Sequence, residues 1–174
     1  MLPGISAEDC LFSDLGIDPS YPGLQTLEAT DFLLRNRQLL TDLHVIIWQV
    51  GCVGDVGFRR KGYINQNFHI LISRLQSIYG NDYEITHYVG AQYPVCKSQI
   101  EPIPLSKFLE PETAKRVSGI STFYIPPKDD RKIDAKMAVE LGLCKTEEDA
   151  KKLPSLRDRA IDRYGPREMQ AINA

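Results

Sequence analysis

An apolar run in the first third of the chain constrains the fold more than any other stretch. Residues 43–54 read LHVIIWQVGCVG, so the run ends in one amide side chain, Gln49, and two glycines. A continuous apolar run that is rich in β-branched residues and bounded by Asp42 and Gly51 is typical of a strand buried on both faces. We therefore predict that it forms the central strand of a sheet.

Gln49 is the polar residue at the end of this predicted strand. A buried amide is strongly unfavourable unless its donors and its acceptor find partners. Two interpretations are open: a ligand at the carboxyl end of the strand supplies the partners, or neighbouring backbone groups supply them. The backbone interpretation is the commoner one in proteins, and this stretch alone favours it.

Local signals predict two helices. Ser6 is a good N-cap, acidic residues occupy the turn after it, and Gly16 is placed to end a helix. The amino end of this helix could hold a carboxylate or a ribose, although Ser at this position is more often an ordinary cap. A second helix, capped by Asn65 or Asn67, ends at Gly80. Its apolar stripe consists of Phe68, Leu71, Ile72, Leu75 and Ile78.

Strand patterns recur along the rest of the first 128 residues. Extended segments are expected at residues 24–34, 83–89, 100–105 and 119–127, and the two prolines of the third place it at a sheet edge. A helical turn is expected at residues 110–117. Gly90 and Ala91 follow the second of these segments and leave room for a ligand beside the backbone. This order of elements predicts an α/β fold with a mixed sheet and flanking helices.

The charge pattern changes at residue 129, which predicts a first domain at residues 1–128 and a helical extension at residues 129–174. Twenty of the last 46 residues are charged, ten of each sign. Thr146 is placed as an N-cap. The apolar positions form two stripes, one with Ile133, Met137 and Leu141 and one with Leu156, Ala160, Ile161 and Tyr164. These helices lack a core of their own, so we expect them to pack on a partner.

Composition argues against several classes of function. A net charge of −2 and a pI near 5.9 give no general attraction to nucleic acid or to anionic membranes. No apolar run approaches the roughly 20 residues needed to cross a bilayer. The four cysteines lie far apart without a Cys-x-x-Cys pair, which indicates no metal site and reduced thiols, and Cys10 and Cys52 are expected to be buried. We expect a cytoplasmic protein.

Several motifs resemble a known family of enzymes. PGISA at residues 3–7, the run that ends at Gln49, the Gly90-Ala91 turn and GIST at residues 119–122 resemble the carboxyl half of tetrapyrrole-methylase-type S-adenosylmethionine-dependent methyltransferases. Longer runs resemble the fungal borosin precursors, which methylate backbone amides of their own carboxyl-terminal peptide. These runs are SAEDCLF (6–12), IDP (17–19), QVGCVG (49–54), AKRV (114–117) and STFYIPP (121–127).

The resemblance implies a cofactor cleft between two α/β lobes. It implies S-adenosylmethionine as the cofactor, with contacts from Ser6, Ala7, Gln49, Gly90, Ser121 and Thr122. These residues mostly lie at predicted strand ends or at a helix start, where backbone groups are free to bind a ligand. The alternative for Ser121 and Thr122 is that their hydroxyls bond within the sheet, and the resemblance favours ligand contact.

The chain also departs from the family pattern. The glycine-rich loop and the catalytic tyrosine and arginine residues of the family's amino-terminal lobe have no counterpart in these 174 residues, so no catalytic residue is assigned. We expect part of a methyltransferase for peptide backbone amides that lacks its catalytic lobe and its substrate peptide. The isolated chain is then expected to be inactive and to bind the cofactor weakly.

Two kinds of partner follow from this interpretation. One is the missing amino-terminal lobe or a second polypeptide, together with a peptide substrate, and the other is a second copy of the chain that binds through the helical extension. The alternative function is a non-catalytic binding or dimerisation module that complements a separate polypeptide.

Overall fold

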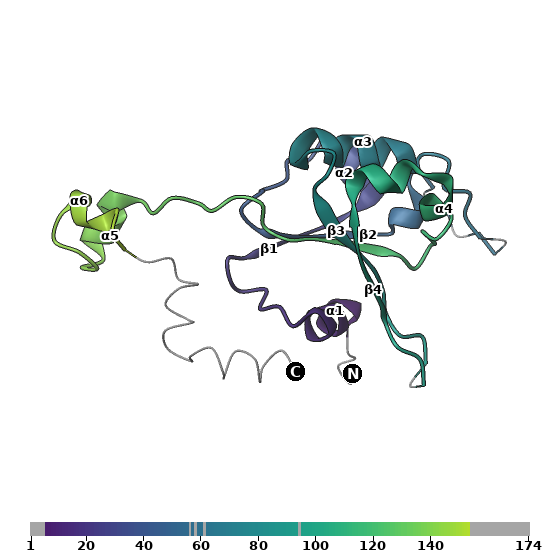
Figure 1. Ribbon diagram of the computed structural model, residues 1–174, viewed down its shortest axis with the longest axis horizontal. Helices are drawn as coiled ribbons and strands as arrows, with labels where there is room; N and C mark the ends of the chain where they lie inside the picture. Colours follow the sequence, from purple (N-terminus) through teal and green to yellow (C-terminus); the bar gives the residue numbers. More distant parts are fainter. Residues whose placement is uncertain (1–5, 56, 58, 61, 94, 154–174) are drawn as a thin grey trace. The chain divides into compact units, whose positions relative to one another are not determined.

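The computed structural model describes residues 6–55, 57, 59–60, 62–93 and 95–153 (Figure 1). The chain divides into two compact units, Met1–Asp129 and Asp130–Ala174, and we describe each by itself.

Five strands of the first unit form one mixed sheet (Figure 1). Their order across the sheet is β1 (Leu24–Glu28), β2 (His44–Trp48), β5 (Thr122–Ile125), β3 (Glu84–Val89) and β4 (Gln99–Pro104). β1 and β2 are parallel, and the other neighbouring pairs are antiparallel. The prediction of an α/β fold with a mixed sheet is therefore confirmed, and the proline-containing strand lies at an edge as predicted.

The apolar run at residues 43–54 forms β2 only as far as Trp48. Val45, Ile46 and Ile47 are fully buried, as predicted for a strand that is covered on both faces. The middle of the sheet belongs to β5, however, so the prediction that this run is the central strand is wrong. β2 is an interior strand with one neighbour on each side.

β2 ends at Trp48 because the chain turns at the next residue. Gln49 has φ 58° and ψ 34°, and the 3₁₀ helix η1 (Val50–Cys52) follows it. The side chain of Asn65 pairs with the backbone here, since its Nδ2 donates to Val50 O at 3.0 Å and its Oδ1 accepts from Val53 N at 3.3 Å. These hydrogen bonds satisfy backbone groups that a longer strand would have paired with a neighbouring strand.

Helices cover both faces of the sheet. α2 (Ala29–Leu34), α3 (Phe68–Tyr79) and α4 (Pro111–Ala114) lie on one side, and α1 (Ala7–Leu15) lies on the other (Figure 1). A second 3₁₀ helix, η2 (Leu105–Leu109), connects β4 to α4. The first unit is thus a three-layer arrangement with the sheet in the middle.

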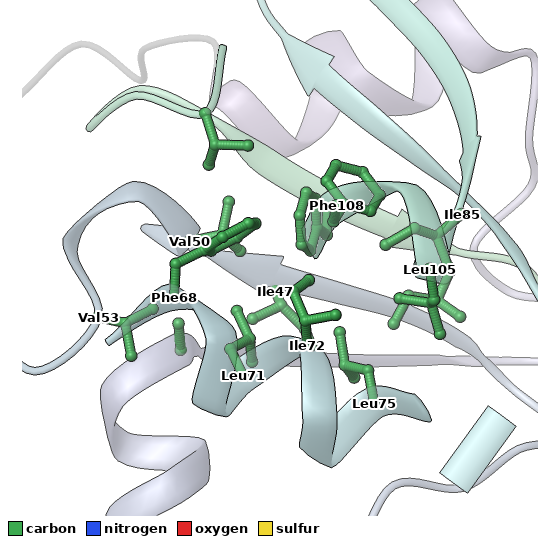
Figure 2. Packing of buried hydrophobic residues seen from close by; sticks show 14 of the residues in the cluster. Ile47, Val50, Val53, Phe68, Leu71, Ile72, Leu75, Ile85, Leu105 and Phe108 are labelled. Atoms are coloured by element: carbon green, nitrogen blue, oxygen red, sulfur yellow. The ribbon is translucent and has the colours of Figure 1, made fainter. Parts of the chain in front are cut away.

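Successive residues of β2 face opposite cores, as the alternation of side chains along a strand requires. Ile46 packs with Leu11 of α1 and with Tyr88 and Tyr124. Ile47 lies in the larger core on the α3 side (Figure 2). The residues of this larger core that Figure 2 labels with it are Val50, Val53, Phe68, Leu71, Ile72, Leu75, Ile85, Leu105 and Phe108.

The two predicted helices of this unit are confirmed in position. Ser6 caps α1 by accepting from Asp9 N at 3.1 Å, and Gly16 ends it with φ 62°. α3 ends at Gly80 as predicted, but Asn67 does not cap it with its side chain, because its Nδ2 donates to Val53 O. Cys52 is buried, whereas Cys10 lies on the exposed side of α1, so the prediction of a buried Cys10 is wrong.

The prediction of one extended segment at residues 24–34 is wrong in its second half. Only Leu24–Glu28 is a strand, and α2 begins directly after it. The Glu28 carboxylate accepts hydrogen bonds from Thr30 N at 2.9 Å and from Asp31 N at 2.6 Å, so it caps the helix. Glu is not among the preferred capping residues, which is why the sequence pattern missed this boundary.

The described part of the second unit, residues 130–153, contains two short helices, α5 (Ala135–Glu140) and α6 (Glu147–Ala150). Thr146 caps α6 as predicted, and Asp134 caps α5. Ala138 and Ala150 are buried, but the predicted stripe of Ile133, Met137 and Leu141 is exposed, at 47%, 47% and 65%. The second predicted stripe, Leu156, Ala160, Ile161 and Tyr164, lies outside the described residues.

Candidate functional site

A cleft of about 650 Å³ opens at one end of the sheet in the first unit. Gln49 follows the carboxyl end of β2, and Gly90 follows the carboxyl end of β3. β5 is antiparallel to both strands, so the residues at its amino end, Ser121 and Thr122, lie beside them. α1 adds the far wall. The lining residues are Ala7, Asp9, Cys10, Ser13, Asp14, Trp48, Gln49, Tyr88, Gly90, Ala91, Gln92, Ser98, Gly119, Ile120, Ser121 and Thr122.

The structure brings together five of the six residues that the sequence predicted as cofactor contacts. These five are Ala7, Gln49, Gly90, Ser121 and Thr122. Ser6 is not part of the cleft lining. Its hydroxyl donates to the Asp9 carboxylate at 2.8 Å and accepts from Asp9 N, so it is used in capping α1.

Gln49 lies in the cleft without the burial that its position in the sequence predicted. The residue is exposed, and its side chain makes no hydrogen bond to any other described residue. The premise of a buried amide at a strand end is therefore wrong, because the chain turns out of the sheet at this residue. The interpretation that backbone groups satisfy the amide also fails within the described residues, and the amide is free to meet a ligand.

The Ser121 hydroxyl is held from inside the protein. Its Oγ accepts from Ser118 N at 2.9 Å and lies 2.7 Å from Nε2 of His87. Ser121 and His87 are each only 1% exposed. Burial lowers the pKa of His87, with the Glu101 carboxylate acting in the opposite direction. The interpretation that the Ser121 hydroxyl bonds within the protein is correct, and the residue lines the cleft as well.

One wall of the cleft is acidic and aromatic. Asp14 Oδ2 accepts from the Tyr88 hydroxyl at 2.7 Å, and burial together with this bond raises the pKa of Tyr88 to about 12. The Trp48 indole is oriented by its Nε1, which donates to Thr26 Oγ1 at 2.6 Å. Among the described residues that line the cleft, none is Lys, Arg or His, whereas Asp9 and Asp14 are both present.

Sequence reasoning missed Asp14, Tyr88 and Trp48 as cleft residues. For Asp14 a signal was available, because Ala7, Cys10 and Asp14 recur at helical spacing and therefore share one face of the helix. Cys10, which was expected to be buried, lies on this face and lines the cleft. The face of α1 that packs on the sheet contains Leu11, with Leu15 packed against the same cluster.

A second cavity of about 540 Å³ adjoins the first, since both are lined by Gln49 and Gly119. Its acidic residues are already paired. Glu28 caps α2, Asp31 pairs with Arg35 and Arg37, and Asp55 pairs with Arg59. The two arginines lower the pKa of Asp31 through hydrogen bonds. This cavity therefore presents few unsatisfied polar groups to a ligand.

Neither a metal site nor a membrane-spanning helix is found among the described residues. No three His, Cys, Asp or Glu side chains there lie close enough together to bind a metal ion. None of the helices in the same part of the chain has both the length and the hydrophobicity to span a bilayer.

Comparison with known proteins gives relatives over most of the chain, although no protein-family model matches it. A methyltransferase/ribosomally synthesized cyclic peptide gymnopeptides precursor from Gymnopus fusipes is 49% identical over 143 residues, which is 81% of this chain and 34% of that protein. A methyltransferase/type III borosin cyclic peptide precursor from Anomoporia bombycina is 48% identical over 83% of this chain and 17% of its own length.

A third relative aligns with the whole chain. It is a methyltransferase/ribosomally synthesized type I borosin cyclic peptide precursor from Mycena rosella, 40% identical over 174 residues, which is 43% of its length. The chain thus spans less than half the length of each of these curated relatives. By sequence the chain is a homologue of part of the fungal borosin methyltransferase/cyclic peptide precursors.

Proposed function

We propose that this chain is the carboxyl lobe of a tetrapyrrole-methylase-type methyltransferase and that its cleft binds S-adenosylmethionine. In this proposal residues 1–128 form the lobe, and residues 129–174 begin a clasp-like extension. The observation that carries the proposal is the convergence of Ala7, Gln49, Gly90, Ser121 and Thr122 on one cleft. The resemblance selected these residues from separate parts of the sequence.

The cleft fits the cofactor in size and in charge. Its volume of about 650 Å³ lies within the range of roughly 300–1,000 Å³ typical of small-molecule sites. S-adenosylmethionine carries a sulfonium and an ammonium group, and the carboxylates of Asp9 and Asp14 offset positive charge. The Trp48 ring provides an aromatic face, which attracts cations and stacks on a base.

The cofactor supplies an electrophilic methyl group for transfer to a backbone amide nitrogen of a peptide. An amide is a poor nucleophile, so the protein must position it and stabilise the imidate-like charge that develops. The described lining residues contain no cation and no unpaired acid suited to either task. We therefore propose that residues other than these, in the same or in a separate polypeptide, complete the cleft and supply the catalytic residues.

The first prediction is that Gln49→Ala weakens cofactor binding and leaves stability unchanged. Gln49 is exposed and makes no hydrogen bond to another described residue, so truncation removes neither core volume nor an internal hydrogen bond. Loss of one neutral hydrogen bond to a ligand corresponds to roughly threefold to tenfold in affinity. The measurement is a titration of the full chain with S-adenosylhomocysteine, paired with thermal unfolding. A loss of stability with unchanged affinity would remove Gln49 from the site.

A second candidate function is a dimerisation module, and the exposed apolar stripe of the second unit favours it. Ile133, Met137 and Leu141 are each about half exposed or more, and Leu143 beside them is 51% exposed. Exposed apolar side chains that gather on one surface mark interaction sites. Both functions are compatible, because a methyltransferase lobe can also dimerise through its extension.

The second prediction tests this surface directly. The double substitution Met137→Glu and Leu141→Glu in the full chain should raise the dissociation constant of self-association by about tenfold or more, because an unpaired carboxylate is strongly disfavoured in an apolar contact. Sedimentation equilibrium measures this constant. Leu34→Glu on the first unit, at a residue that is 76% exposed, is the matched control and should leave it unchanged. A monomeric wild-type chain at high concentration would exclude the module.

A further inference from the structure

His87 is a buried titratable residue next to the cleft, and no step of the proposed reaction uses it. It lies on β3 opposite Glu101 of β4 and Phe123 of β5. The edges of Phe108 and Phe123 meet its ring, with centroids 6.5 and 6.2 Å away. The charged groups that face it are the Glu101 carboxylate and, behind that carboxylate, the Arg116 guanidinium.

Two buried atoms face each other on one side of the His87 ring. Nδ1 of His87 makes no hydrogen bond within the described residues, whereas Oε2 of Glu101 is ion-paired with the Arg116 guanidinium. Nδ1 and Oε2 lie 3.6 Å apart. Nη1 of Arg116 lies 2.9 Å from the same carboxylate. An ionised carboxylate can only accept, so a proton on Nδ1 turns this contact into attraction, whereas a bare Nδ1 lone pair would be repelled.

The other side of the ring then has a defined role. With the proton on Nδ1, Nε2 carries a lone pair and accepts from the Ser121 hydroxyl, 2.7 Å away. Ser118 N already donates to the same oxygen at 2.9 Å. A hydroxyl has one donor and two acceptor positions, so one acceptor position of the Ser121 oxygen remains. Ser121 is one of the residues that line the cleft, although only 1% of its surface is exposed.

We propose that His87 is a positioning residue of the cleft. Its neutral imidazole carries its proton on Nδ1, towards Glu101, and its Nε2 accepts a hydrogen bond from the Ser121 hydroxyl. Because the hydroxyl proton is used in this way, Ser121 can only accept a hydrogen bond from the ligand. The group recognised there is a donor such as a ribose hydroxyl, an ammonium or an amino N–H. The ligand part of this inference rests on the proposed function, but the tautomer of His87 does not.

Acid should reverse the preference of Ser121 for a ligand group that donates a hydrogen bond. When His87 is protonated, both ring nitrogens donate, so the Ser121 hydroxyl loses its acceptor at Nε2 and must direct its proton elsewhere. Burial in the aromatic layer lowers the pKa of His87, so the imidazole is neutral at pH 7 and the change occurs below its usual titration range. A ligand donor at Ser121 is therefore bound best at neutral pH and loses its acceptor as the pH falls.

The ligand-free test is the ¹⁵N spectrum of the imidazoles in the full chain, with His44 and His69 as internal controls. His44 Nε2 lies 3.1 Å from Tyr21 O, which only accepts, and its Nδ1 lies 2.8 Å from the Tyr124 hydroxyl, so His44 should be protonated on Nε2. His87 should show the opposite tautomer. His69 is exposed, and its Nδ1 lies 3.0 Å from Gln66 O, which only accepts, so His69 should be protonated on Nδ1. A proton on Nε2 of His87 at neutral pH overturns the inference.

The ligand test compares two variants of His87 with S-adenosylhomocysteine as the probe. His87→Phe keeps an aromatic ring but offers no acceptor to Ser121, so affinity should fall by roughly threefold to tenfold. His87→Gln retains an acceptor and should recover part of the loss. Wild-type affinity should decline as the pH is lowered below about 6.5, and the His87→Phe affinity should stay flat over the same range. His69→Gln is the control for general effects.

The outcomes separate the two proposals. If the wild-type chain binds the probe and His87→Phe binds it equally well with the same pH profile, the positioning role is overturned. If the wild-type chain shows the predicted tautomer but no binding at any accessible concentration of the probe, the proposed function is overturned instead. If His87→Phe does not fold, the tautomer and the His87→Gln titration still decide the question.

Discussion

Gly51→Ala is expected to destabilise the chain by about 3 kcal/mol, at the upper end of the cost of overpacking. A Cβ at position 51 would lie 1.9 Å from Ser118 O and 2.2 Å from Ser118 C. These two atoms belong to the backbone of Ser118, which cannot rotate away from the new methyl group as the end of a flexible side chain can. η1 and the turn at residues 118–120 would have to separate, and this turn leads directly into the Ser121 and Thr122 wall of the cleft. Any ligand binding should therefore be lost as well.

Urea unfolding of the full chain measures this effect, and Gly57→Ala is the matched control. A Cβ at Gly57 meets nothing within 4 Å, so that variant should be as stable as the wild type. If Gly51→Ala unfolded at the wild-type urea concentration, the close approach of η1 to residue 118 would be contradicted. The placement of residues 118–122 beside the cleft would then need revision.

The second large effect is expected for Phe123→Ala, at about 3–5 kcal/mol of lost stability, the usual cost of removing a buried aromatic side chain. Phe123 is fully buried in β5, the middle strand. Its ring centroid lies 4.7 Å from that of Phe108 and 6.0 Å from that of Phe68. The substitution opens a cavity where β5, η2 and α3 meet. The backbone of the sheet cannot collapse to fill this cavity.

Ile64→Ala is the control for this prediction, because Ile64 is 84% exposed and its truncation should change stability by less than about 0.5 kcal/mol. Both variants are compared by urea unfolding of the full chain. A loss of less than about 1 kcal/mol for Phe123→Ala would mean that the aromatic cluster is not the closely packed core described here.

Much of the fold could be predicted because its signals are local. The capping box at Ser6, the left-handed Gly16 and the apolar stripe of α3 each depend on residues within a few positions. The turn out of the sheet at Gln49 and the start of α2 at Ala29 were missed because both depend on contacts made by side chains in unusual roles. Asn65 forms a hydrogen bond with Val50, 15 residues away, in the turn after β2. Glu28 caps the amino end of α2.

The candidate site was predictable only in part for the same reason. Gln49, Gly90 and Thr122 carry local signals, since each lies where a strand ends or begins. Strand order cannot be read from strand patterns alone, so nothing in the sequence placed β5 between β2 and β3. That placement brings His87 within reach of Ser121, 34 residues away, and makes Tyr88 a neighbour of Asp14 across 74 residues.

The central claim is that the cleft at the end of the sheet binds the cofactor, and backbone amide chemical shifts test it most directly. S-adenosylhomocysteine is titrated into the ¹⁵N-labelled full chain at millimolar concentrations, where weak binding by one lobe is still detected. We predict weak, saturable shifts that cluster at Ala7, Gln49, Gly90, Ala91 and Thr122, and that Gln49→Ala reduces. No shift in these amides, or shifts confined to the second cavity or to α5 and α6, would contradict the account.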